Sequence, residues 1–169
     1  MQFNWRITKY DPQYRNPEGH FTQEEWTSYA DIGKLYNNKS LTYNDYLKTE
    51  TLYINAIHYF INELAISSLQ IIELERPNAI INDAHNTNEM ITLFNDIRDN
   101  DWIKSDQIDT LCKLILREQI WCKLINDEKI YIHFGYDYYM YIGTILPCQN
   151  AITQIHYEGL FVEELKSPY

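Results

Sequence analysis

The residues best placed to attract a cation are three aspartates, Asp96, Asp99 and Asp101, which come just before Trp102. Carboxylates at this spacing could ligate a hard metal ion, or they could pair with lysines and arginines of another protein. A calcium loop of the EF-hand type also needs a glycine and a distant glutamate, and this segment has neither. We therefore expect no metal ion here and treat the three aspartates and Trp102 as a candidate docking patch.

Side chains that usually carry catalysis are scattered along the chain. The five histidines form no H-E-x-x-H or H-x-x-x-H pair, and the three cysteines form no C-x-x-C motif. The sequence also lacks a G-x-S-x-G nucleophile elbow and the glycine-rich loops that bind nucleotide phosphates. We therefore expect no resident metal, no cofactor and no catalytic activity.

Tyrosine is unusually frequent, with 15 in 169 residues, and several of them gather between Tyr136 and Tyr141. Tyrosine is enriched in protein interfaces because its ring gives a large contact area with a polar end. Tyr136 and Tyr138 are therefore candidate contact residues. The pattern fits a partly buried sheet with aromatic cross-strand pairs equally well. It also leaves open a small-molecule-binding or enzymatic domain that uses this tyrosine-rich sheet.

The chain is strongly acidic, with 24 Asp and Glu against 14 Lys and Arg, which gives a formal net charge of −10. Such a surface repels phosphates, which argues against direct binding of nucleic acid or of an anionic membrane. Residues 73–109 alone hold nine acids and three bases, a local sum of −6. This segment is either a solvated face or a patch that steers a basic partner protein.

Hydrophobic periodicity predicts a single α+β domain in which an antiparallel sheet packs with three to four helices. Phe3, Trp5 and Ile7 alternate with polar residues, which is typical of an N-terminal strand. Two short loops predict a three-stranded antiparallel meander over residues 120–142. The other predicted strands cover residues 69–75 and 160–165. The predicted helices cover residues 23–32, 43–64, 88–98 and 147–155, with one more that begins at residue 105.

Two of these helices rest on specific signals. Thr22 and Glu25 have the spacing of a capping box, which predicts that a helix follows and ends at Gly33. In the long helix over residues 43–64, apolar residues recur at helical spacing and define the face that we expect to be buried. This face includes Leu47, Ile54, Ile57 and Ile61.

Two stretches of the sequence, taken together, resemble a group of small stand-alone bacterial proteins. The first is WRITKYDP at residues 5–12 with EWTSYADIG at residues 25–33, and the second is HFGYDYYMYIG at residues 133–143. We associate such proteins with toxin–immunity loci of polymorphic or contact-dependent growth-inhibition systems. The resemblance implies an immunity protein that binds and neutralises a cognate toxin domain, and it assigns no catalytic residue.

The charge of the chain agrees with that implication, because a nuclease toxin must be basic to bind nucleic acid and an acidic inhibitor can occupy the same cleft. The expected partner is therefore a basic toxin C-terminal domain of nuclease type. The N-terminus lacks the charged-then-apolar order of a secretion signal, and no apolar stretch approaches the ~20 residues that span a bilayer. We therefore expect a cytoplasmic protein. The predicted contact residues are Asp96, Asp99, Asp101, Trp102, Tyr136 and Tyr138.

Overall fold

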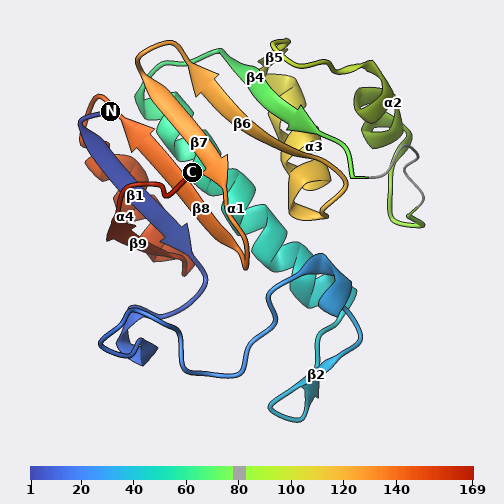
Figure 1. Ribbon diagram of the computed structural model, residues 1–169, viewed down its shortest axis with the longest axis vertical. Helices are drawn as coiled ribbons and strands as arrows, with labels where there is room; N and C mark the ends of the chain where they lie inside the picture. Colours follow the sequence, from blue (N-terminus) through green and yellow to red (C-terminus); the bar gives the residue numbers. More distant parts are fainter. Residues whose placement is uncertain (78–82) are drawn as a thin grey trace.

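A computed structural model describes residues 1–77 and 83–169 and shows an α+β fold (Figure 1). The α-helices are α1 (Tyr43–Glu63), α2 (Asn88–Asp96), α3 (Ser105–Leu116) and α4 (Gln149–Glu158). The strands are β1 (Phe3–Thr8), β2 (Leu35–Tyr36), β3 (Lys39–Ser40), β4 (Ser68–Glu75), β5 (Trp102–Lys104), β6 (Trp121–Asn126), β7 (Ile130–Phe134), β8 (Tyr139–Thr144) and β9 (Phe161–Glu164). Two short 3-10 helices cover Pro12–Tyr14 and Tyr29–Asp31.

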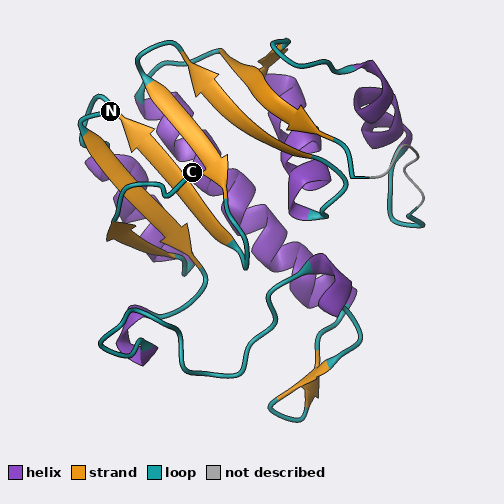
Figure 2. Ribbon diagram, viewed as in Figure 1, coloured by secondary structure: helices purple, strands orange, loops and turns teal. Residues whose placement is uncertain are grey.

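Seven strands form one antiparallel sheet in the order β5-β4-β6-β7-β8-β1-β9. Helices α1, α3 and α4 lie against one face of this sheet, and the chain returns across the other face to its C-terminus (Figures 1 and 2). β2 and β3 form a separate small hairpin away from the sheet. The predicted fold class is confirmed, although the sheet holds more strands than the meander and the N-terminal strand.

The predicted meander corresponds to β6, β7 and β8, which pair in antiparallel register. Ile130, Ile132 and Phe134 of β7 are buried toward the helices, whereas Tyr131 and His133 lie half-buried on the opposite face. This alternation follows from the two-residue period of a strand, in which successive side chains point to opposite faces. No helix occurs between Tyr131 and Tyr141.

The long helix is confirmed as α1. It begins after Thr42, whose hydroxyl accepts a hydrogen bond from the backbone N–H of Asp45 and so satisfies a free donor of the first turn. Ile54, Ile57 and Ile61 are buried as predicted, and Leu47 is only partly buried.

The prediction of a helix over residues 23–32 is wrong. The Thr22 hydroxyl donates to the carbonyl of Tyr14, so it does not cap a helix. Trp26 is buried with its ring 4.8 Å from that of Tyr138, and its carbonyl accepts a hydrogen bond from Lys9 Nζ at 2.6 Å. These long-range contacts hold the segment in a non-helical path. The capping box lies further along the chain, at Ser28, and opens only the short turn Tyr29–Asp31.

A buried ion pair joins the helical layer to the segments around it. The Arg117 guanidinium donates to both carboxylate oxygens of Glu50, at 2.7 and 2.8 Å, and the two side chains are 4% and 2% exposed. Arg117 also donates to the carbonyl of His85 at 3.1 Å and lies 5.9 Å from the ring centres of Tyr29 and Tyr43. One residue at the end of α3 thus contacts α1, the segment before α2 and the N-terminal arm.

Burial opposes the charge on Arg117, but the hydrogen bonds and the negative charge of Glu50 outweigh this effect and raise the pKa of Arg117. Arg117 therefore keeps its positive charge inside the protein. Removing one partner leaves the other charge without compensation in a place that water does not reach.

We expect the Ile57→Ala substitution to lower the free energy of unfolding by roughly 2–4 kcal/mol, because Ile57 is completely buried and the substitution leaves a cavity. Urea denaturation measures this change. Lys48→Ala, on the exposed side of the same helix, is the control and should stay within about 0.5 kcal/mol of the original protein. Similar values for the two variants would contradict our assignment of the buried face.

We expect Glu50→Leu and Arg117→Met each to lower the free energy of unfolding by about 3–5 kcal/mol, because each leaves one buried charge without a partner. The double variant should cost less than the sum of the two, since it leaves no unpaired charge. A double-mutant cycle by urea denaturation measures the coupling. Additive costs would show that the two side chains act independently.

Candidate functional site

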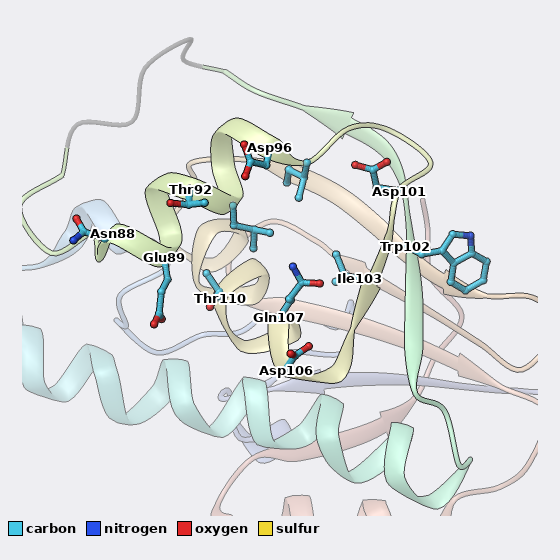
Figure 3. A pocket seen from close by; sticks show the side chains of 12 residues that line it. Asn88, Glu89, Thr92, Asp96, Asp101, Trp102, Ile103, Asp106, Gln107 and Thr110 are labelled. Atoms are coloured by element: carbon cyan, nitrogen blue, oxygen red, sulfur yellow. The ribbon is translucent and has the colours of Figure 1, made fainter.

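The acidic segment builds a groove of about 620 Å³ between α2, α3 and β5 (Figure 3). Its floor is apolar and consists of the buried side chains of Leu93, Ile97 and Ile103. Four exposed carboxylates surround it: Glu89 and Asp96 on α2, and Asp101 and Asp106 on the side of β5 and α3. We call this feature the acidic groove.

Two of the three basic residues in the acidic segment are bound to backbone carbonyls at the end of α2. Arg76 donates to the carbonyls of Phe94 and Ile97. Arg98 donates to the carbonyls of Asn95 and Ile97. Both guanidinium groups thereby satisfy the free acceptors at a helix C-terminus, where a positive charge is favourable. Among the described residues that line the groove, none is lysine or arginine.

Of the three predicted aspartates, Asp96 and Asp101 line the groove and Asp99 does not. Asp99 Oδ1 accepts a hydrogen bond from the backbone N–H of Leu74 at 3.0 Å, so this carboxylate holds the loop against β4. Asp101 has a double role, because its Oδ2 also accepts a hydrogen bond from the N–H of Arg98 at 2.7 Å. Asp99 therefore supports the loop structure, and its predicted contact with a partner lies outside the groove.

Trp102 borders the groove from β5, a strand that the sequence did not predict. Its neighbour Ile103 is buried toward the helices, and the indole of Trp102 extends to the other side, away from α2 and α3 (Figure 3). Trp102 is 49% exposed. The predicted anchor is thus an accessible aromatic ring beside the groove and not part of its floor.

The two predicted tyrosines lie away from the groove. Tyr136 is 79% exposed on the turn between β7 and β8, close to the end of β4 that is opposite to β5. Tyr138 is only 7% exposed, and its hydroxyl donates to the carbonyl of Leu116. The prediction of Tyr138 as a docking residue is therefore corrected, because its ring belongs to the core beside Trp26 and Tyr53.

Sequence reasoning missed two of the four groove carboxylates, Glu89 and Asp106. Both lie in the first turn of a helix, where a negative charge interacts favourably with the helix dipole. That position was visible in the sequence as an acid shortly after each predicted helix start. Only the packing of α2 against α3 brings the two side chains to the same groove.

The tyrosine-rich face of the sheet contains a histidine with an unusual environment. His133 stacks on Tyr131, with 4.4 Å between ring centres, and its Nδ1 lies 2.9 Å from the hydroxyl of Ser167 in the C-terminal segment. Burial, reinforced by the positive charge of Lys123, lowers the pKa of His133 from 6.5 to about 4. His133 is therefore neutral at physiological pH and helps to hold the C-terminal segment on the sheet.

Within residues 1–77 and 83–169, no group of His, Cys, Asp and Glu is arranged to hold a metal ion. None of the helices described there is both long and apolar enough to cross a membrane. The thiols of Cys112, Cys122 and Cys148 are free and buried, and burial raises the pKa of each.

Comparisons of the chain with protein-family models, with curated proteins and with solved structures found no match.

We expect His133 to make the stability of the protein depend on pH. Folding lowers its pKa, so between pH 6.5 and about 4 the unfolded chain binds this proton more tightly than the folded chain does. The stability that depends on the neutral ring is complete above pH 6.5 and is lost as the pH falls toward 4. Urea unfolding on both sides of this interval measures the effect. His133→Gln should show a smaller loss, and an equal loss would remove His133 as its source.

Proposed function

We propose that this protein is an immunity protein that binds and neutralises a basic bacterial toxin domain of nuclease type in the cytoplasm. The observation that carries the proposal is the acidic groove, in which four carboxylates surround an apolar floor and no described lining residue is a cation. Four exposed carboxylates thus meet at one concave site.

The chemistry of the groove matches the side chains that a nuclease presents to nucleic acid. Lysines and arginines that hold phosphates can pair with the carboxylates of Glu89, Asp96 and Asp106. Their aliphatic stems can at the same time pack on the apolar floor. A toxin that places these cations in the groove can no longer use them for its substrate, so binding alone would inhibit it.

Trp102 adds to this proposed contact, because a half-exposed aromatic ring beside a charged groove provides area that a partner can bury. Tyr136 does not belong to it. That residue lies near the far end of β4, whereas the groove adjoins the end of β4 that pairs with β5.

The two stretches that resemble immunity proteins form one structural unit. β1 pairs with β8 along its whole length, and the ring of Tyr10 lies 5.4 Å from that of Tyr139. Many of these residues are buried in the sheet, as Ile7 and Met140 are. A resemblance in such residues supports a shared fold, and the toxin-binding residues would be expected to differ from one immunity protein to another.

We expect the triple variant Glu89→Gln, Asp96→Asn, Asp106→Asn to associate at least ~10-fold more slowly with the toxin domain encoded next to this gene, measured by surface plasmon resonance at low salt. The three carboxylates are chosen because they line the groove, whereas Asp99 and Asp101 also support backbone turns. Added salt should slow the association of the original protein strongly and that of the variant weakly, because salt screens the attraction that the variant lacks.

The matched control is Asp127→Asn, Glu128→Gln, Glu164→Gln, which removes the same charge from segments outside the groove. It should associate at nearly the original rate and should still protect cells that express the toxin. Equal association rates for the two triple variants would assign the effect to net charge and reject the groove as the docking site. A failure of the original protein to bind the adjacent toxin domain would reject the proposed function.

A further inference from the structure

A second cavity, of about 740 Å³, lies at the end of the sheet opposite to the acidic groove. The turn between β7 and β8, the start of β6, the end of α3 and the end of β4 surround it. Its size is in the range of small-molecule sites. The proposed toxin contact does not use this cavity.

Three exposed carboxylates lie at the cavity: Glu75 at the end of β4, Glu118 after α3, and Asp137 in the turn between β7 and β8. None of the three forms an ion pair or a side-chain hydrogen bond with a described residue. They come from three different segments, and no three acids in the described chain stand close enough together to hold one metal ion. This arrangement suits a ligand that carries several separated positive charges.

Aromatic rings form much of the wall between these carboxylates. Trp121, Tyr136 and Tyr169 line the cavity, and the rings of Tyr136 and Tyr169 meet edge to face with 6.2 Å between centres. Methylene groups pack well on such rings, and ammonium groups are attracted to the ring faces. The indole N–H of Trp121 donates to the carbonyl of Phe134 at 2.8 Å, which fixes this ring in place.

The cavity is also lined by one arginine, Arg76, whose Nε and Nη2 groups bind backbone carbonyls. Its guanidinium group binds the carbonyls of Phe94 and Ile97 and lies 5.4 Å from the centre of the Phe94 ring. Lys123, near Trp121, is paired with Glu73 at 2.7 Å. Among the described residues, neither cation forms an ion pair with any of the three carboxylates.

We propose that this cavity binds a linear organic polycation of the polyamine class. The amines would pair with the separated carboxylates, and the methylene segments between them would lie on the aromatic wall. A diamine can reach fewer of the carboxylates than a triamine, and an inorganic divalent ion cannot use the aromatic wall.

The backbone conformation at two of the carboxylates allows substitutions that remove the charge and should not disturb the fold. Glu118 and Asp137 both have a left-handed backbone, with φ of 59° and 57°. Glycine adopts this conformation without strain, and asparagine adopts it more readily than most residues. Glu118→Gly and Asp137→Asn therefore remove a charge without damaging the fold, and Glu118→Gly should even raise the melting temperature.

The experiment is a titration of the purified chain with spermidine at low ionic strength, followed by calorimetry and by the indole N–H resonances in NMR spectra. The resonance of Trp121 should shift and that of Trp102, beside the acidic groove, should not. Spermidine should bind more tightly than putrescine, and Glu118→Gly and Asp137→Asn should each weaken its binding about two- to fivefold, the usual effect of one exposed ion pair.

Asp127→Asn is the matched control, because Asp127 has the same type of backbone, with φ of 40°, in the turn between β6 and β7. It should leave spermidine binding unchanged. The proposal is overturned if Asp127→Asn weakens binding as much as Asp137→Asn, if only the Trp102 resonance shifts, or if magnesium chloride gives the same shifts as spermidine.

Discussion

The ion pair between Arg117 and Glu50 is the interaction on which the arrangement of both candidate sites depends. It lies where the end of α3 meets the middle of α1, and the same guanidinium group also binds the carbonyl of His85, shortly before α2 begins. The relative position of α2 and α3 defines the acidic groove, and the end of α3 forms part of the second cavity. A buried charge that needs several partners at once tolerates few alternative packings, because each alternative leaves it without compensation.

The basic and the acidic side chains of this protein lie in different environments, which its composition does not reveal. The arginines mostly bind groups of the protein itself: Arg76 and Arg98 cap α2, and Arg6 binds Glu163 across neighbouring strands. Many acids remain at the surface, and they border two hollows at opposite ends of β4. The local charge at these two hollows is therefore more negative than an even distribution of the net charge of −10 over the surface would give.

Most strands and the four α-helices of residues 1–77 and 83–169 could be predicted, because their hydrophobic periodicity is local and strong. The errors arose where distant contacts decide the local structure. Trp26 is drawn into the core and prevents the helix that its neighbours favour. At the site, the sequence identified the acidic segment but could not separate Asp99, which supports a loop, from Glu89 and Asp106, which line the groove. That distinction depends on which backbone N–H group lies within reach of each carboxylate.

The position of β1 in the sheet has a consequence for how the chain acquires its structure. β1 pairs on one side with β8 and on the other with β9, so that Arg6 binds Glu163, a residue 157 positions later. A ribosome must therefore release the residues of β8 or β9 before β1 finds the corresponding neighbour. Pairings of such long range are slow to form because a large loop has to close first. The newly made N-terminal segment, with its aromatic residues, therefore stays without its strand partners until β8 and β9 have been made, and an unpaired strand of this kind is exposed to aggregation.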